Sequence, residues 1–259
     1  MKQCPLSACS HTPGHVHKHV GRTRSLAIAL AIAAAAVWPQ GPVYAQDTAL
    51  HATAASAYSW RGITRHDKPV LHPALEINYH EFRTVIWGAI LTDELDDINN
   101  SGLLREVDIE LALSLDVFPY VIDIGYTEYI FSDFLENTRE VFCAVTLPVN
   151  QMLDLNALLT YDMGAYKDFY AQVGGRVHGE VVQNLQAAVE LSFAAAGNGF
   201  SQGKRGGFHD FGITLSLTHL VDRHVQWGID LIQNGSLDKK VLPEQEVDTV
   251  LAVRASINL

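Results

Sequence analysis

The sequence predicts an all-β protein, an antiparallel up-and-down transmembrane β-barrel of about 12 strands. Three observations indicate this fold. Apolar and polar residues alternate with period two, the alternating segments are 10 to 14 residues long, and the connections between them are long and short in turn. Alternation places one set of side chains on each face of a sheet. Strands of soluble sheets usually have about 5–6 residues, whereas a tilted strand needs about 9–11 residues to cross a bilayer.

The first 45 residues differ in composition from the rest of the chain. They hold four basic residues and no acidic one, followed by an uninterrupted apolar run over residues 26–37 and by Pro39. A basic start, a short apolar run and a small residue, Ala45, before an acidic segment are typical of a secretory signal peptide. The apolar run covers only about 18 Å of helix, which is too short for a membrane anchor. We therefore predict a signal peptide over residues 1–45 and a barrel over residues 46–259.

Composition excludes several classes of protein. With 48% hydrophobic residues the chain is not a disordered one, and three Cys in 259 residues do not make a disulfide-rich mini-protein. Without residues 1–45 the chain keeps 14 of its 18 Lys and Arg and all 29 Asp and Glu, a net charge of −15. Nucleic-acid binding is therefore not expected, because phosphate contacts need a basic surface. Cys143 is the one Cys after residue 45, so no internal disulfide is expected.

The alternation is clearest over residues 105–117, where Val107 and Ile109 alternate with Glu106 and Asp108. Residues 208–219 and 246–259 repeat the pattern. Continued along the chain, it predicts twelve strands. They cover residues 49–60, 72–82, 83–92, 105–117, 119–131, 138–148, 151–162, 166–178, 182–195, 208–219, 223–233 and 246–259.

The predicted connections fall into two groups. Long ones cover residues 61–71, 93–104, 132–137, 163–165, 196–207 and 234–245, and short ones lie near 82–83, 118–119, 149–150, 179–181 and 220–222. Short turns at one end and longer loops at the other are typical of outer-membrane barrels, as are girdles of aromatic residues near the strand ends. The soluble alternative is a secreted or periplasmic β-sandwich or lipocalin-like barrel. The aromatic residues near predicted strand ends are Tyr58, Trp60, Tyr79, Phe82, Phe118, Tyr120, Tyr126, Tyr161, Tyr166, Phe169 and Trp227.

The polar face of the predicted strands is rich in carboxylates, with eleven acids against two Arg. In a barrel this face lines the lumen, and a wet lumen lined with carboxylates favours cations over anions. The alternative is a filled lumen with protonated or paired carboxylates, since twelve strands lie between the filled barrels of about eight and the open ones of about sixteen. The predicted lumen-lining residues are Glu76, Glu106, Asp108, Glu110, Asp123, Glu140, Asp154, Arg176, Glu190, Asp210, Asp230, Asp248 and Arg254.

Basic residues follow the first predicted strand. Arg61 and Gly62 come directly after it, and Arg65, His66 and Lys68 lie a few residues further on. One interpretation is a basic patch that contacts lipopolysaccharide phosphates or an anionic solute. The other, which we favour, is a tight loop in which Arg61 hydrogen-bonds carboxylates of the lumen.

Several stretches of the sequence resemble the TorF-like porin family, a group of Gram-negative outer-membrane β-barrel proteins. The family's Ser-x-Tyr-x-x-Arg-Gly-x-Ser motif is matched by residues 56–64, and its Pro-Ala, Trp-Gly and Glu-x-Asp elements follow in order up to residue 129. The resemblance implies a porin-like role and supplies no catalytic residues. The residues that match the family motif are Tyr58, Arg61, Gly62, Pro73, Tyr79 and Trp87.

These observations predict a porin-like channel of the cell outer membrane that passes small solutes and prefers cations, and that is not an enzyme. The alternatives are a filled-lumen barrel with a structural or adhesive role and a soluble periplasmic β-protein. No metal or cofactor is expected, because His219 and His224 have no Cys or carboxylate pattern beside them. The expected partners are outer-membrane lipids and lipopolysaccharide, small solutes and the barrel-assembly machinery.

Overall fold

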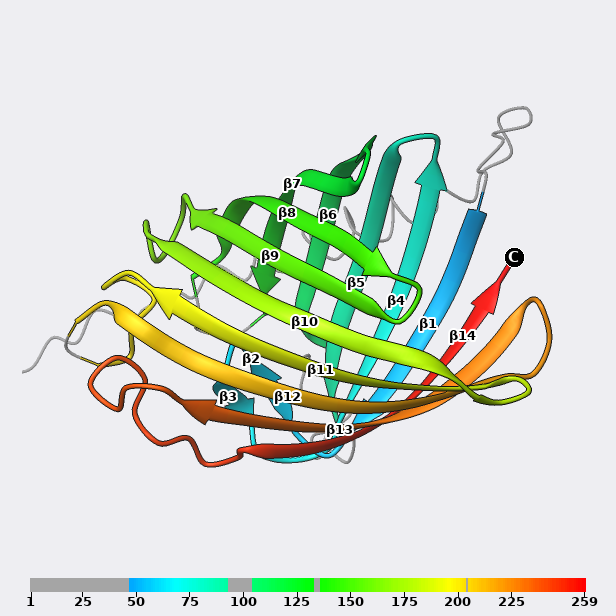
Figure 1. The fold of residues 1–259 in the computed structure, drawn as a ribbon. Helices are drawn as coiled ribbons and strands as arrows, with labels where there is room; N and C mark the ends of the chain where they lie inside the picture. Colours follow the sequence, from blue (N-terminus) through cyan, green and yellow to red (C-terminus); the bar gives the residue numbers. More distant parts are fainter. Residues whose placement is uncertain (1–46, 93–103, 133–135, 204) are drawn as a thin grey trace, which may run out of the picture. The chain divides into compact units, whose positions relative to one another are not determined.

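The computed structural model describes residues 47–92, 104–132, 136–203 and 205–259. Within these residues twelve strands close into an antiparallel barrel, and two short strands form a separate sheet (Figure 1). In the same residues no helix is long and apolar enough to cross a membrane. The predicted signal peptide, residues 1–45, and nearly all of the predicted loop 93–104 lie outside the described residues. The strands are β1 (Asp47–Ala55), β2 (Tyr58–Trp60), β3 (Ile63–His66), β4 (Val70–Tyr79), β5 (Phe82–Leu91), β6 (Leu104–Val117), β7 (Tyr120–Phe131), β8 (Thr138–Asn150), β9 (Leu153–Asp162), β10 (Phe169–Val182), β11 (Leu185–Ala196), β12 (Gly207–Leu220), β13 (Val225–Ser236) and β14 (Thr249–Asn258).

The barrel has up-and-down topology. From β4 to β14 each strand pairs antiparallel with its neighbours in sequence, and β1 closes the barrel by pairing with both β14 and β4. The backbone N–H of Leu259 donates to the Thr48 carbonyl at 2.8 Å, so the end of the chain lies beside the start of β1. The predicted fold class and number of barrel strands are therefore confirmed.

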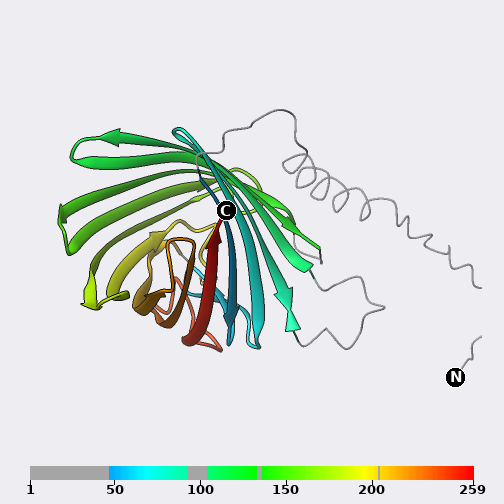
Figure 2. The same ribbon diagram turned by 90° about the vertical axis from the view of Figure 1, so that its right-hand side faces the viewer.

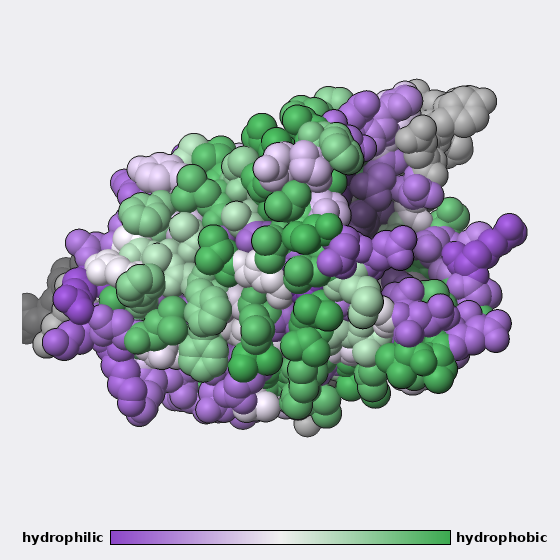
Figure 3. Space-filling model, viewed as in Figure 1, coloured by the Kyte–Doolittle hydropathy of each residue, from purple (hydrophilic) through white to green (hydrophobic). Residues whose placement is uncertain are grey.

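The outer face of the barrel is apolar. In β12, Leu215 and Leu217 are 45% and 49% exposed, whereas Ser216 between them is half-buried. Figure 3 shows apolar residues over the middle of the visible face and hydrophilic ones towards both ends. Exposed apolar surface of this extent marks contact with a membrane or with another protein. Other large apolar side chains exposed on the strands include Leu50, Leu111, Leu159, Val173, Leu191, Leu231 and Leu251.

The two ends of the barrel differ. At one, named here the turn end, the connections are the short turns 80–81, 118–119, 151–152, 183–184 and 221–224. His80 and Asn184 in these turns have φ values of 54° and 65°. The other, named the loop end, carries residues 56–69, 163–168, 197–203, 205–206 and 237–248. Within the described residues, the predicted alternation of short turns and longer loops is confirmed.

The predicted end of the first strand, at residue 60, is wrong. β1 stops at Ala55, and residues 58–60 pair with β3 instead, in a hairpin that lies within the ring of barrel strands (Figure 2). Arg61 and Gly62 have φ values of 52° and 73°, the backbone of a two-residue type I′ turn. The sequence pattern does not mark the end of β1, because side chains alternate with period two both in a hairpin and in a barrel wall.

The aromatic residues near strand ends divide into two groups. Tyr79, Phe82, Phe118 and Tyr120 are exposed at the turn end, as expected of an interfacial girdle. Tyr58, Trp60 and Tyr166 were expected in the girdles as well, but they pack inside the barrel around the hairpin. The exposed and the interior aromatic residues lie at similar distances from the strand ends, so position in the sequence does not distinguish the two groups.

Candidate functional site

The hairpin formed by β2 and β3 crosses the interior of the barrel. It leaves the wall between β1 and β4, and its turn residue Arg61 reaches Glu140 of β8 on the far side. The guanidinium donates two hydrogen bonds to the carboxylate, Nη1 to Oε1 at 2.7 Å and Nη2 to Oε2 at 2.6 Å. The Tyr129 hydroxyl donates to the same carboxylate at 3.1 Å. This bidentate geometry is among the strongest polar contacts available to side chains.

Aromatic rings surround the Arg61 guanidinium. Its Cζ lies 4.4 Å from the ring centroid of Trp60, 4.5 Å from that of Tyr170 and 5.2 Å from that of Phe200. Burial lowers the pKa of Arg61, but the hydrogen bonds and charge of Glu140 outweigh burial and raise the pKa overall. Arg61 is therefore a permanent cation held by a carboxylate and three π faces.

Gly62 lets the tip of the hairpin approach the wall closely. A Cβ added at this position would lie 2.7 Å from the Cβ of Asp210 in β12, so no other residue fits here without displacement. The Asp210 carboxylate accepts hydrogen bonds from the Tyr170 hydroxyl at 3.1 Å and is 2.8 Å from Nδ1 of His209. The Arg61-Gly62 pair is thus seated against β8, β10 and β12 together.

Polar contacts also tie the sides of the hairpin to loop-end residues. The Thr64 hydroxyl donates to the Val247 carbonyl at 3.1 Å, and the Thr64 backbone N–H donates to the Gln245 side chain at 3.0 Å. On the other strand, Asn234 donates to the Ser59 hydroxyl at 3.2 Å. The hairpin is held along its length, and it narrows the lumen at the loop end.

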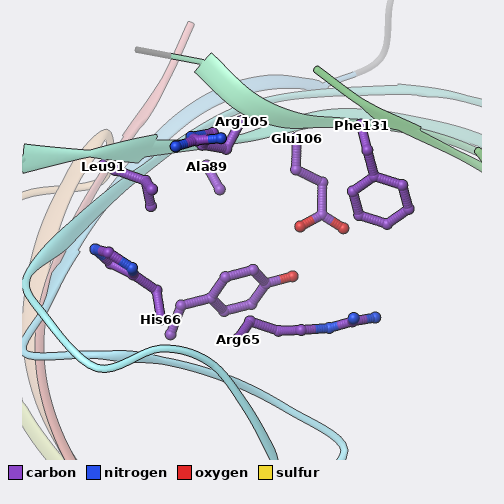
Figure 4. A pocket seen from close by; sticks show the side chains of 8 residues that line it. Arg65, His66, Ala89, Leu91, Arg105, Glu106 and Phe131 are labelled. Atoms are coloured by element: carbon purple, nitrogen blue, oxygen red, sulfur yellow. The ribbon is translucent and has the colours of Figure 1, made fainter. Parts of the chain in front are cut away.

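A cavity of about 220 Å³ lies beside the hairpin. Figure 4 shows the Glu106 carboxylate and the Arg65 side chain directed into this space from opposite sides. Burial and the charges of Glu106 and Asp108 raise the pKa of Tyr58, so its hydroxyl stays neutral. The cavity is lined by Tyr58, Arg65 and His66 of the hairpin and by Ala89, Leu91, Arg105, Glu106 and Phe131 of the wall.

Towards the turn end, basic groups partner the lumen carboxylates. Arg83 lies 3.1 Å from Glu110 and 3.6 Å from Asp123. The Arg254 Nε donates to Asp230 at 2.8 Å. His178 lies 3.1 Å from Asp154, and His51 lies 3.5 Å from Glu76. Carboxylates here therefore alternate with cationic or titratable groups around the wall.

The predicted lumen-lining residues thus fall into two groups. Glu106, Asp108, Glu140 and Asp210 gather around the hairpin, whereas Glu76, Glu110, Asp123, Asp154, Asp230 and Arg254 lie towards the turn end. Arg176 and Glu190 are direct cross-strand neighbours on β10 and β11. Asp248 differs from the prediction, because it precedes β14 and is exposed at the loop end.

The residues that match the family motif lie in two places, inside the barrel and on its exposed surface. Tyr58, Arg61 and Gly62 are in the hairpin, and Trp87 of β5 lies inside, with its ring 4.5 Å from that of His72 and 5.7 Å from that of Tyr58. Pro73 and Tyr79 are exposed on β4. Four of the six motif residues therefore belong to the hairpin and the wall that supports it.

Two charged residues were missed by the strand pattern. Arg83 was assigned to a turn, although it shares the period-two position of Trp87. Asp162 has the same parity as Asp154 and is fully buried, where it accepts backbone hydrogen bonds from Gly164 and Tyr166 at 2.9 Å. The period-two alternation, continued to the ends of β5 and β9, would have placed both residues on the polar face.

Comparison with known proteins gives a likeness in fold only. No family model matches the sequence, and no curated protein matches it. The KdgM porin matches with a TM-score of 0.55 and 8% identity, over 81% of this chain and 98% of that chain. The same porin in complex with disordered oligogalacturonate gives 0.54 and 7% identity over 82% of this chain and 98% of that chain. The NanC porin gives 0.55 and 10% identity over 81% and 100%.

The closed barrel, its apolar outer face and this likeness define the class of protein. The chain is an outer-membrane β-barrel of porin-like architecture. The predicted location in the outer membrane is therefore confirmed, and the soluble alternative is wrong. The finer resemblance to the TorF-like family stays a prediction.

Proposed function

We propose that the protein is a channel that lets small solutes cross the outer membrane and that prefers cations. The observation that supports this most is the lining of the barrel, where charged side chains follow one another from the hairpin to the turn end. In the part of the chain that the structure describes, ten of the eleven acids that we propose for the lumen lie within wall strands, as does Asp162. Six Arg oppose them, two on the hairpin and four on the wall; these are Arg61, Arg65, Arg83, Arg105, Arg176 and Arg254. The excess of carboxylates gives the lumen a negative field.

The charge of the lining argues for a different solute class from that of one structural neighbour. The KdgM porin is described with oligogalacturonate, an anionic oligosaccharide. A lumen with more carboxylates than Arg repels a polyanion and concentrates cations. We propose that the loop end faces the outside and that outer-membrane lipids and lipopolysaccharide surround the apolar outer face. We also propose that the barrel-assembly machinery inserts the protein into the outer membrane.

The ion preference of the channel can be tested on β6. Glu106, Asp108 and Glu110 share one face of this strand at successive depths, about 6.6 Å apart by strand rise. We expect the parent channel in planar bilayers to prefer K⁺ over Cl⁻. The triple variant Glu106→Gln, Asp108→Asn, Glu110→Gln should lose much of this preference, measured as the reversal potential in a salt gradient. The preference should also fall as salt rises, because screening shortens to about 3 Å at 1 M.

The matched control is Glu81→Gln, which removes one charge from an exposed turn. It should leave the reversal potential unchanged. An anion-selective parent would contradict the electrostatic argument, since it would mean that the lumen carboxylates are neutralised.

The orientation of the barrel can be tested by labelling. In a Cys143→Ala background, Lys240→Cys places a thiol in the exposed loop 237–248, and Asp222→Cys places one in a turn at the opposite end. We expect a membrane-impermeant maleimide to label the thiol at position 240 on intact cells and the thiol at position 222 only after lysis. The reverse pattern would invert the proposed orientation.

A second candidate function, a filled barrel with a structural or adhesive role, is favoured by the anchoring of the hairpin across the lumen. It predicts no conductance from the folded protein in planar bilayers. Conductance that is absent in the parent, and absent again when the hairpin is released, would support this function over the channel.

A further inference from the structure

The cavity beside the hairpin differs in charge from the rest of the lumen. Three of the eight residues that line it are basic, namely Arg65, His66 and Arg105, and one, Glu106, is acidic. The hairpin and the wall strand β6 supply the charged groups together. A local excess of positive charge thus lies within a lumen whose overall charge is negative.

Groups of both signs reach the same small space. Glu106 of β6 is only 5% exposed, and its carboxylate enters the cavity from the wall (Figure 4). Arg65 enters from the hairpin, with one Nη donating to the Tyr166 hydroxyl at 3.2 Å. The Arg65 Nε is buried and has no hydrogen-bond partner among the residues that the structure describes. A buried donor without a partner is destabilising, so an acceptor on a ligand would be favoured at this point.

The rest of the lining is apolar or aromatic. Leu91 and Ala89 of β5 and Phe131 of β7 form one side, and the Tyr58 ring lies on the hairpin side. The volume, about 220 Å³, is below the range of roughly 300–1,000 Å³ of sites for drug-sized molecules. The cavity therefore fits a solute of about the size of one amino acid.

We infer that this cavity binds small zwitterionic solutes, in particular α-amino acids with an apolar side chain. Arg65 is placed for the carboxylate, Glu106 for the ammonium group, and Phe131 for the apolar part (Figure 4). A simple anion would meet the Glu106 carboxylate, and a simple cation would meet Arg65. The inference deepens the proposed channel function, because the bound solute would be one in transit past the hairpin.

Binding can be measured independently of conduction, by titration calorimetry of the purified, folded barrel in detergent at pH 7. The probes are L-phenylalanine, its cationic analogue phenethylamine and its anionic analogue 3-phenylpropanoate, which share one aromatic group. We expect phenylalanine to bind at least about tenfold more tightly than either analogue, which corresponds to one additional charge-assisted contact. Equal binding of all three, tighter binding of either analogue, or no binding of phenylalanine would overturn the inference.

Substitutions test whether Arg65 binds the carboxylate of the solute and Glu106 its ammonium group. Arg65→Gln should weaken binding of phenylalanine about tenfold and leave phenethylamine unweakened. Glu106→Gln should weaken phenylalanine similarly and leave 3-phenylpropanoate unweakened. Arg176→Gln and Glu190→Gln remove the same charges outside the cavity and should change none of the affinities. Phenylalanine affinity that is insensitive to both cavity variants would place the site elsewhere.

Folding of every variant is checked by the mobility shift between unheated and boiled samples. Should Arg65→Gln fail to fold, Phe131→Ala tests the same cavity through its apolar side and should weaken phenylalanine binding at least fivefold. Failure of the channel proposal remains distinguishable, because a barrel that binds phenylalanine without conducting ions retains the site and loses only the proposed transport. A barrel that conducts ions without binding phenylalanine retains the channel and loses the site.

Discussion

Replacing Arg61 with Ala is expected to release the hairpin and to raise the single-channel conductance severalfold. The side chains of Arg61 and Glu140 are only 11% and 2% exposed. Breaking a buried ion pair by removing one partner is destabilising by about 3–5 kcal/mol, because the other charge remains buried. The variant also loses the contacts of the guanidinium with Trp60, Tyr170 and Phe200. Since these contacts join the tip of the hairpin to the far wall, their loss opens the narrow part of the lumen.

Two further variants separate release of the hairpin from a change of charge. Glu140→Gln keeps the volume but removes the carboxylate, so it should raise conductance less than Arg61→Ala. Arg254→Gln removes an Arg from an ion pair towards the turn end and should leave the conductance within about a factor of two of the parent, because single-channel currents change little when a charge outside the constriction is lost. Equal conductance of Arg61→Ala and the parent would show that the hairpin does not limit ion flow.

Replacing Leu215 with Arg is expected to destabilise the barrel by about 2–4 kcal/mol, the cost of an Arg on the lipid face at the bilayer midplane. Leu215 is 45% exposed and lies in the middle part of β12. Its cross-strand partners are Val189 and Leu231, both exposed and apolar. Neither partner offers a carboxylate, so the guanidinium would enter hydrocarbon.

The matched substitution is Ser216→Arg, one residue further along the same strand. Ser216 lies directly opposite Asp230 in the register of β12 and β13, on the polar face. Its cost should therefore be smaller than that of Leu215→Arg. Urea titrations of the folded barrel in lipid vesicles measure both free energies of unfolding. Equal costs, or the reverse order, would mean that the two faces are assigned wrongly.

The strand pattern identified the barrel because the signal is local and repeated. A strand with one face to lipid and one to the lumen shows its alternation within about ten residues. The same parity assigns Glu106, Asp108 and Glu140 to the polar face, and the structure buries Glu106 and Glu140. It failed at strand ends, where a shift of the assigned turn by a residue or two hid Arg83 and extended the last strand over Asp248.

The sequence by itself determined the barrel, its twelve wall strands, its apolar outer face and the excess of carboxylates on the inner one. These follow from periodicity, length and composition, each of which is read within a single strand or a short segment. Only the tertiary structure decided that residues 58–66 turn inward and that Arg61 meets a carboxylate 79 positions away. Barrel closure sets which walls face each other, and the type I′ turn at Arg61 and Gly62 then directs the guanidinium across the lumen. That pairing depends on strands far apart in the chain, so the cavity beside the hairpin has no counterpart in any local pattern of the sequence.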